Sequence, residues 1–545
     1  FTHKNQVPLQ TSPSNGRRSS KFNCPTPQRM ALCARIHARL SPLTNLYSNL
    51  SARWENAHDL PAIAVPGETL VTYGGLDRLS AQFASRLVAL GVEPGERVVA
   101  QIEKSAGAVA LYLACLRLGA AFVPLNTAYT PHEVEYFLRD ARPVVFVCTP
   151  EAFAGLCPIA MAADVAHVAM MSASQQIGLW QEASNTSPLA EIAPRREEDL
   201  AAIVYTSGTT GRSKGAMLSH GNLSSNALAL HKLWGFVPGD VLLHALPIYH
   251  VHGLFVALHT AFLNASNILL HNRFEAAEIR NALPKASVLM GVPTFYARLL
   301  EAGITRVECA HMRLFVSGSA PLTAPAFAAW EERTGHKILE RYGMTETGMI
   351  ASNPLGGARI AGTVGYALPG VSARIADNEG RELPRGEIGV IEVRGPNVFN
   401  GYWHMPEKTA QEFRKDGFFI TGDMGQLSAD GRVTTVGRAK DVIIAGGFNI
   451  YPKEIEDVLD HVPGVAESAV IGVPHVEMGE GVVAVLAPTR AGEPVPVGVL
   501  QWALDENLAR FKHPRKFIWL DTLPRNAMGK VEKAALRARY KDAYQ

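Results

Sequence analysis

The chain has few cysteines, little net charge and no long uninterrupted apolar run. Its longest apolar stretch, residues 108–125, is interrupted by Arg117 and Gly119 and has Pro124 near its end, so we interpret it as a buried helix running into a strand rather than a membrane span. The six cysteines form no CxxC or ligand-like pair, which favours reduced core thiols over disulfides or a zinc site. A formal net charge of +2 indicates no nucleic-acid or anionic-membrane partner.

Acidic residues are also missing from the amino-terminal segment, where the first is Glu55. Before it, eight Lys or Arg residues are spread among many Ser, Thr, Pro and Asn residues, a composition typical of an organelle transit peptide and also of a disordered tail. From Met30, which could be a true start because the chain begins at Phe1, apolar residues follow a helical spacing with Arg35 and Arg39 on another face. We therefore expect residues 1–45 to lie outside the fold and the protein to be mitochondrial, with cytoplasm or plastid as alternatives.

Length and patterning predict an α/β protein of more than one domain. With 545 residues, 47% of them apolar, the chain exceeds the size at which one core keeps growing. Short β-branched runs alternate with amphipathic helical segments up to about residue 437, which predicts parallel-sheet αβα subdomains in an N-terminal domain over residues 46–439. Closely spaced strands and Gly/Asp turns indicate a small β-rich subdomain at about 373–436, and a smaller α+β C-terminal domain follows at 440–545.

The segment Tyr205–His220 has the composition of a phosphate-binding loop. Its glycines allow backbone N–H groups to approach an anion, its hydroxyls add donors, and its lysine supplies a charge for terminal phosphates. The residues concerned are Thr206, Ser207, Gly208, Thr209, Thr210, Gly211 and Lys214. The order Ser213-Lys214-Gly215 is not that of a Walker A loop, and a solvated turn between a strand at 201–205 and a helix starting near Asn222 remains the alternative.

Five further motifs follow this loop in a fixed order. They are Tyr342–Gly348, Thr421–Asp423, Gly437–Asp441, Gly446–Pro452 and Pro524–Lys530. Together the six motifs resemble those of the adenylate-forming enzymes, the family of acyl-CoA synthetases, luciferases and peptide-synthetase adenylation domains. The resemblance covers roughly residues 45–540 and implies that the C-terminal domain is mobile and swings about Lys440 between two half-reactions.

The resemblance implies that ATP activates a carboxylic acid as an acyl adenylate, with release of pyrophosphate, before a thiol displaces AMP. Lys530 then matches the catalytic lysine between carboxylate and α-phosphate, and Glu346 matches the Mg²⁺ ligand. Thr345 would act in catalysis as a donor to the α-phosphate. The remaining implied ATP-binding residues are Ser319, Ala320, Tyr342 over the adenine, Gly343, Met344, and the ribose-binding pair Asp423 and Arg438. Taken singly, Lys530, Glu346 and Asp423 could equally be a surface lysine, a helix N-terminal acid and a turn residue.

The thiol is expected to be CoA. Gly446 and Gly447 resemble the loop that lines the pantetheine channel, although a hairpin turn would use the same residues. Because the chain ends about fifteen residues after Lys530 with no carrier-like domain, we expect an external thiol, and a monomer or weak oligomer.

Within this family the chain looks closest to malonyl-CoA synthetases, at residues 247–254, 341–347 and 451–456. A dicarboxylate brings a second negative charge that requires nearby cations. By this resemblance we expect Arg273 and Arg313 to bind the distal carboxylate, with His250 as an additional catalytic-site donor. If both arginines point elsewhere, a 4-coumarate-like or medium-chain acyl-CoA synthetase is the alternative.

Two other classes stay open at this point. A phosphotransferase driven by a nucleoside triphosphate could use the glycine-rich loop and would form ADP. A non-catalytic nucleotide-binding protein could retain the fold, although the presence of Lys214, Glu346, Asp423, Arg438 and Lys530 together argues against it.

Overall fold

The computed structural model describes residues 45–173, 177–206, 213–445, 448–476, 478–526 and 529–544. The transit-peptide prediction, the loop residues Ser207, Gly208, Thr209, Thr210 and Gly211, and the channel glycines Gly446 and Gly447 therefore lie outside the described residues.

A six-stranded sheet forms the first layer of the fold, with strand order β6-β5-β3-β4-β7-β8. All neighbours are parallel except β7 and β8. The strands are β3 (Arg97–Gln101), β4 (Ala121–Pro124), β5 (Val145–Cys148), β6 (His167–Met170), β7 (Leu200–Thr206) and β8 (Lys214–Ser219). The short runs of buried Val, Phe and Cys in these strands are those expected where helices cover both faces of a sheet.

A nine-stranded sheet forms the second layer, with strand order β15-β14-β13-β12-β11-β9-β10-β1-β2. It is parallel from β13 to β1 and antiparallel at its edges. Its strands are β1 (Pro61–Ala64), β2 (Val71–Thr72), β9 (Val241–His244), β10 (Asn267–Leu270), β11 (Val288–Gly291), β12 (Leu314–Ser317), β13 (Leu339–Met344), β14 (Gly348–Ser352) and β15 (Tyr366–Ala367).

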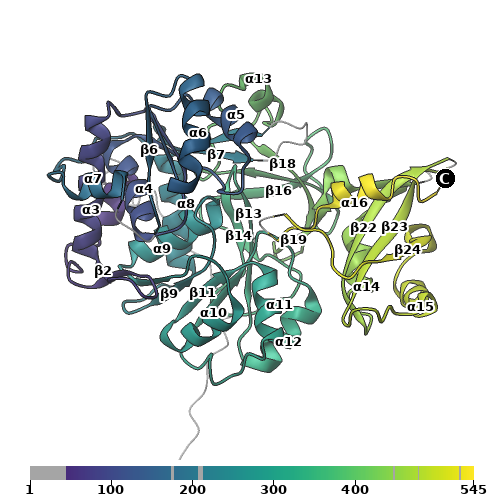
Figure 1. The fold of residues 1–545 in the computed structure, drawn as a ribbon. Helices are drawn as coiled ribbons and strands as arrows, with labels where there is room; N and C mark the ends of the chain where they lie inside the picture. Colours follow the sequence, from purple (N-terminus) through teal and green to yellow (C-terminus); the bar gives the residue numbers. More distant parts are fainter. Residues whose placement is uncertain are drawn as a thin grey trace, which may run out of the picture. The chain divides into compact units, whose positions relative to one another are not determined.

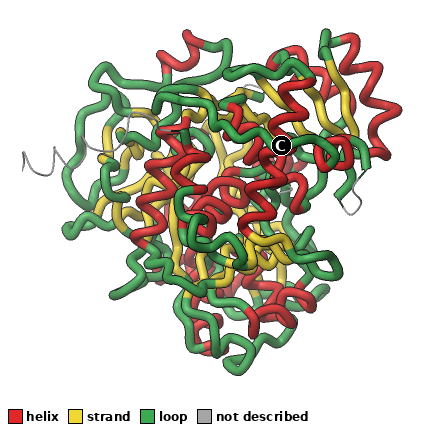
Figure 2. Tube along the Cα trace, turned by 90° about the vertical axis from the view of Figure 1, so that its left-hand side faces the viewer, coloured by secondary structure: helices red, strands yellow, loops and turns green. Residues whose placement is uncertain are grey.

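Helices cover these two sheets, as Figures 1 and 2 show. They are α2 (Leu46–Ser51), α3 (Tyr73–Ala89), α4 (Ala106–Leu118), α5 (Pro131–Ala141), α6 (Pro150–Ala162), α7 (Leu179–Ser184), α8 (His220–Leu233), α9 (Leu258–Leu263), α10 (Ala276–Ala282), α11 (Pro293–Glu301) and α12 (Ala324–Thr334). Local sequence sets several ends: Thr130 and Glu133 form a capping box on α5, and Gly119, with φ 73°, ends α4. The predicted parallel α/β fold is confirmed.

Two antiparallel-rich sheets complete the chain. A four-stranded antiparallel sheet contains β16 (Ser372–Ala376), β17 (Gly389–Arg394), β18 (Phe419–Leu427) and β19 (Val433–Arg438), with α13 (Pro406–Gln411) between β17 and β18. After the 3₁₀ turn η3 (Ala439–Asp441), a five-stranded sheet contains β20 (Ile443–Ala445), β21 (Phe448–Ile450), β22 (Val465–His475), β23 (Gly479–Pro488) and β24 (Lys516–Trp519).

The last sheet is covered on both faces (Figure 1). Alternate residues of β22 enter two different cores, because successive side chains of a strand point to opposite faces. Val470 packs with residues of α14 (Pro452–Leu459) and α15 (Val497–Asn507), whereas Ile471 packs with Leu536 of α16 (Lys533–Arg539). The short 3₁₀ turns η2 (Leu283–Lys285) and η4 (Arg510–Lys512) connect neighbouring elements.

One expected connection is different in the structure. The residues before the helix at α8 were expected to be loop, but Lys214–Ser219 form strand β8, which pairs antiparallel with β7 from Thr206↔Lys214 to Leu200↔Ser219. The helix begins at His220 rather than near Asn222, since the Ser219 side chain accepts the N–H of Asn222 and caps it. Thr206 and Lys214 are therefore opposite each other at the end of the pair where the chain passes from β7 to β8.

No helix in the described ranges has both the length and the apolarity needed to cross a membrane. The cysteines that the structure describes, Cys115, Cys148, Cys157 and Cys309, are all free thiols, as the lack of paired spacing predicted.

Candidate active site

The described residues enclose a cavity of about 650 Å³. It lies where β7 and β13 end, and in α/β sheets ligands bind at the carboxyl ends of the strands. Predicted residues that line it are Thr206, Lys214, His250, Ser319, Gly343, Met344, Thr345, Glu346, Arg438, Lys440 and Lys530. A cavity of this size accommodates a nucleotide together with a small acid.

The β13–β14 hairpin positions Thr345 and Glu346. The strands pair from Arg341↔Ser352 to Met344↔Gly348, so these two residues form the turn at the cavity wall. Glu346 is buried, and its Oε1 lies 3.0 Å from the Tyr402 hydroxyl oxygen. Burial raises the pKa of Glu346 above its usual value, although the charge of Lys214 acts in the opposite direction.

The β18–β19 pair brings Asp423 and Arg438 together, because their Cα atoms are direct partners in the register. Arg438 Nε lies 2.8 Å from Asp423 Oδ1, and the Tyr342 hydroxyl donates to Asp423 Oδ2 at 2.5 Å. Three residues expected around adenine and ribose thus form one cluster, of which Arg438 lines the cavity. Tyr342, Asp423 and Ala320 are not lining residues themselves.

Lys214, the first residue of β8, makes contacts that its motif did not indicate. Its Nζ lies 3.0 Å from Glu412 Oε1 and 4.1 Å from the centre of the Tyr402 ring. The Tyr402 hydroxyl also lies 2.8 Å from Glu412 Oε2. Burial by itself would raise the pKa of Glu412, but hydrogen bonds from Lys408, Tyr402 and Lys214 lower it overall, so Glu412 is a carboxylate.

Lys530 reaches the same cavity from the segment between β24 and α16. Its pKa is lowered by burial and by the neighbouring positive charge of Arg438. An anion bound in the cavity would therefore stabilise the charged ammonium form of Lys530. Lys440, in the exposed turn η3, also lines the cavity. Its predicted role as a hinge, like the domain boundary at 439/440, stays a prediction.

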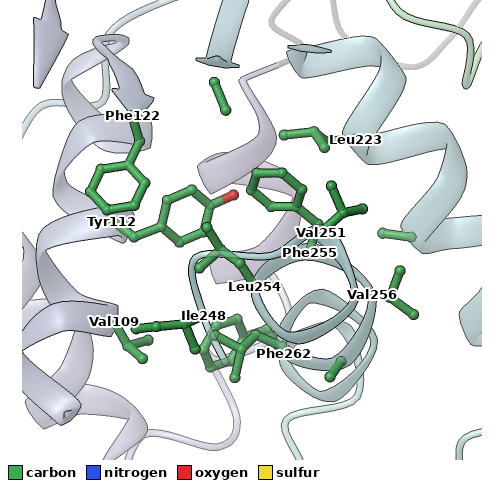
Figure 3. Close-up of a cluster of buried hydrophobic side chains, with 14 of the residues drawn as sticks. Val109, Tyr112, Phe122, Leu223, Ile248, Val251, Leu254, Phe255, Val256 and Phe262 are labelled. Carbon is green, nitrogen blue, oxygen red and sulfur yellow. The ribbon is translucent and has the colours of Figure 1, made fainter. Parts of the chain in front are cut away.

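A π-helical turn begins at His252, two residues after His250. The turn η1 (His252–Ala257) requires Gly253, because a Cβ there would lie 2.1 Å from the Pro247 carbonyl oxygen. Figure 3 shows how η1 is held: Leu254 and Phe255 lie beside Tyr112 of α4, and the ring centroids of Phe255 and Tyr112 are 5.8 Å apart. Burial at ~1.5–3 kcal/mol per large apolar side chain fixes this turn against the helix.

His250 is a neutral donor in this arrangement. Burial lowers its pKa to about 3, helped by the charges of Lys530 and Arg341. Its Nδ1 accepts the backbone N–H of His252 at 3.2 Å, so the ring proton is on Nε2. The expected role of His250 as a donor to the acid stays a prediction.

Arg341 is the main residue that sequence reasoning missed. It lines the cavity, is only 3% exposed, and forms no ion pair with any residue that the structure describes. Its Nε has no hydrogen-bond partner, its Nη2 donates weakly to Ser319 Oγ at 3.4 Å, and burial lowers its pKa to about 9. A buried guanidinium without a counterion calls for an anionic ligand.

The loop after β12 gives this guanidinium its room. A Cβ on Gly318 would lie 2.5 Å from Arg341 Cζ, so the absent side chain leaves the space that the guanidinium fills. The next residue, Ser319, has φ 71°, a left-handed conformation that is uncommon for a residue with a side chain and typical of functional sites.

The two arginines expected at the distal carboxylate do not lie in the cavity. Arg313 precedes β12, at the opposite end of the strand from Ser319, and pairs through Nε and Nη2 with Asp240, whose side chain is 2% exposed. The side chain of Arg273 is 82% exposed and pairs with Glu275 at 2.9 Å. That prediction was wrong, because Arg313 neutralises a buried aspartate and Arg273 lies in solvent.

Other missed residues could have been suspected from their neighbours in the chain. Arg341 directly precedes the Tyr342–Gly348 motif, and His252 follows His250 by two residues. Tyr402 and Glu412 had no such signal, since they reach Lys214 only through tertiary packing. Among the described residues no group of three or more His, Cys, Asp or Glu side chains could hold a metal by itself, so a cation here would need ligand oxygens as well.

Comparison with known proteins identifies the class. The AMP-binding enzyme family model matches residues 50–403, and the model of the AMP-binding enzyme C-terminal domain matches residues 454–530. The chain belongs to this family, and the malonate–CoA ligases among its relatives support an ATP-dependent, adenylate-forming acid–CoA ligase.

The chain is similar to individual members of this family over most of its length. The chain is 36% identical to the mitochondrial malonate–CoA ligase ACSF3 of Mus musculus, over 77% of each chain. It is 33% identical to a feruloyl-CoA synthase of Amycolatopsis sp, over 87% of this chain and 95% of the relative. The crystal structure of ATP-bound MatB from Rhodopseudomonas palustris superposes with a TM-score of 0.89 at 50% identity, over 92% of this chain and 100% of MatB.

Proposed function

We propose that the protein ligates malonate to CoA through a malonyl adenylate, with ATP converted to AMP and pyrophosphate. The observation that carries the choice of acid is Arg341, a cavity-lining guanidinium that is buried without a counterion. The malonate–CoA ligase of mouse supports the same choice by similarity.

Charge explains why a dicarboxylate fits this site. One carboxylate of malonate must react, and the other must enter a cavity where water is largely excluded. A guanidinium binds a carboxylate through two parallel hydrogen bonds, and Arg341 has its Nε unpaired. An acid with one carboxylate would leave Arg341 unpaired, and an uncompensated buried charge costs several kcal/mol.

The first half-reaction uses the cations at the other side of the acid. An oxygen of the reacting carboxylate attacks the α-phosphorus of ATP, and the bond to pyrophosphate breaks. Lys530 lies close enough to Arg438 and Arg341 for both charges to lower its pKa. Its ammonium offsets the negative charges of the carboxylate and the α-phosphate as they approach each other. Thr345 at the adjacent turn donates to the α-phosphate.

Glu346 fits a magnesium ligand. It is a hard oxygen donor, buried at the cavity wall, and it forms no ion pair with a residue that the structure describes. Mg²⁺ usually keeps few protein carboxylates and binds through substrate phosphates, which suits a site with one such residue facing the nucleotide. When bound, the ion offsets charge on the phosphates.

The second half-reaction transfers the acyl group to CoA. The thiol sulfur attacks the acyl carbon, AMP departs, and the thiol proton is lost to solvent. We propose that the domain after Lys440 rotates between the two steps and that Gly446 and Gly447 give the pantetheine arm its passage.

The test is a rate panel of malonate, methylmalonate, succinate, acetate, octanoate, 4-coumarate and ferulate, with wild type, Arg341→Met and Arg273→Met. We expect malonate to lead, and Arg341→Met to lower kcat/KM for malonate by about 10²-fold while ATP affinity changes little. Methylmalonate should be tolerated, since one methyl alters binding by about 1–3 kcal/mol. Arg273→Met is the matched control, because its side chain lies in solvent.

The panel also decides the competing candidate. The feruloyl-CoA synthase of Amycolatopsis aligns with this chain over 95% of its own length, which favours an aromatic acid as the second candidate substrate. Faster turnover of ferulate, 4-coumarate or octanoate than of malonate, or an Arg341→Met variant that keeps full malonate activity, overturns the malonate proposal and leaves the ligase class standing.

For location we propose the mitochondrion, as the name of the mouse relative and the acid-free amino terminus both suggest. A fluorescent fusion of the whole chain should co-localise with mitochondria, and a fusion starting at residue 45 should not. Identical distributions of the two fusions would contradict the import function.

A further inference from the structure

Glu412 lies beside the ATP cavity with an unusual set of partners. Its Oε1 contacts two ammonium groups, Lys214 at 3.0 Å and Lys408 at 2.9 Å. Its Oε2 lies 2.8 Å from the Tyr402 hydroxyl. Of these partners, Lys214 and Tyr402 line the cavity, as does Glu412 itself.

The two lysines differ in what they face. Lys214 lines the cavity, is largely buried and lies over the Tyr402 ring. Lys408, four residues before Glu412, is more exposed and does not line the cavity. If Lys214 leaves Glu412, the carboxylate still has Lys408 and Tyr402, so its charge is never left without a partner.

We propose that Glu412 pairs with the Lys214 ammonium in the nucleotide-free protein. When a nucleotide binds, its terminal phosphates compete with Glu412 for this ammonium. A lysine side chain is a flexible stem with a point charge, so it can turn from one anion to another without backbone movement. Glu412 is therefore a positioning residue for Lys214. Lys408 lowers the free-energy cost of moving Lys214 from Glu412 to the phosphates, because it remains paired with Glu412.

The proposal has a consequence for nucleotide selection. Only a ligand whose phosphates reach Lys214 can take the ammonium from Glu412. ATP carries such phosphates, whereas AMP ends at the α-phosphate. Changes at Glu412 should therefore alter ATP binding and leave AMP binding unchanged.

The experiment measures binding of ATP and of AMP by titration calorimetry, with the full chain, saturating Mg²⁺ and neither acid nor CoA. Glu412→Gln keeps an oxygen for Tyr402 and removes the charge that competes for Lys214, so it should tighten ATP binding about fivefold. In Lys408→Met, Lys214 is the one of the two lysines that still pairs with Glu412. The carboxylate should therefore bind the Lys214 ammonium more strongly, and ATP binding should weaken about threefold. AMP affinity should stay at the wild-type value in both variants.

A double-variant cycle separates this role from simple repulsion between Glu412 and phosphate. In a Lys214→Met background, the effect of Glu412→Gln on ATP should vanish, whereas a direct repulsion would persist there. Weaker ATP binding by Glu412→Gln, equal changes for ATP and AMP, or an effect that survives in Lys214→Met overturns the proposal.

The inference rests on the proposed use of ATP and not on malonate. Because the titrations contain no acid, a failure of the malonate panel leaves them interpretable. A wild-type protein that binds no ATP would instead contradict the ligase reaction itself.

Discussion

At the scale of a single residue, the role proposed for Lys530 can be tested by measuring the two half-reactions separately. Replacing it with alanine removes the ammonium that we propose offsets charge between carboxylate and α-phosphate, so Lys530→Ala should lower adenylate formation by about 10²-fold or more. Thioester formation from preformed acyl adenylate should remain close to wild type. Pyrophosphate release reports the first step and thioester yield the second, and equal losses in both would contradict this division.

Arg313 has a structural role that a second residue-scale prediction tests. Arg313→Ala leaves Asp240 buried with no cation, although Val237 N–H and the Ser287 hydroxyl still donate to it. Removing one member of a buried pair is strongly destabilising, so we expect a loss of about 3 kcal/mol in the free energy of unfolding. Urea denaturation measures it.

The substrate panel gives the control for that variant. At a temperature where Arg313→Ala is folded, its preference for malonate over the other acids should equal that of wild type, because the side chain does not face the cavity. A selective loss of malonate turnover would return Arg313 to the carboxylate site.

At the scale of an element, the loop between β12 and α12 sets the position of Arg341. Gly318→Ala places a Cβ where Arg341 Cζ now lies 2.5 Å away, and the flexible guanidinium rather than the backbone should move. We expect KM for malonate to rise about tenfold with less than about 1 kcal/mol lost in stability. Gly155→Ala, with no atom within 4 Å of the added Cβ, is the matched control and should keep wild-type KM.

At the scale of the whole molecule, Glu340 links stability to pH. Burial raises its pKa to about 8, with Lys453 and the Gly362 N–H acting in the opposite direction. The folded protein therefore holds a proton that the unfolded chain has already released, and stability falls as pH rises from about 4.5 to 8. Each unit of this pKa difference corresponds to about 1.4 kcal/mol.

Glu340→Gln keeps an oxygen for the Gly362 N–H and cannot ionise. Relative to wild type, the variant should be similar near pH 5 and increasingly more stable towards pH 8. Denaturation midpoints of both proteins across this range measure the difference, and a constant difference between the two proteins would contradict the linkage.

Most of the fold could be predicted from local sequence patterns. The parallel strands, among them β3, β5, β11 and β12, were predictable because their β-branched or apolar runs are short and alternate with helical segments. Strand β8 was not, because Lys214–Ser219 alternates poorly and is fixed by pairing with β7.

The sequence by itself determined the class of this protein, because motifs that bind a nucleotide are short, ordered and need their own residue types: Lys214, Glu346, Arg438 and Lys530 all reach one cavity. Only the tertiary structure decided which arginine faces the cavity. Arg313 and Gly318 bracket β12, and four residues at about 3.3 Å each separate one end of a strand from the other. Arg341, beside Gly318 on the neighbouring strand, lies at the end where the cavity opens, and no spacing along the chain specifies that.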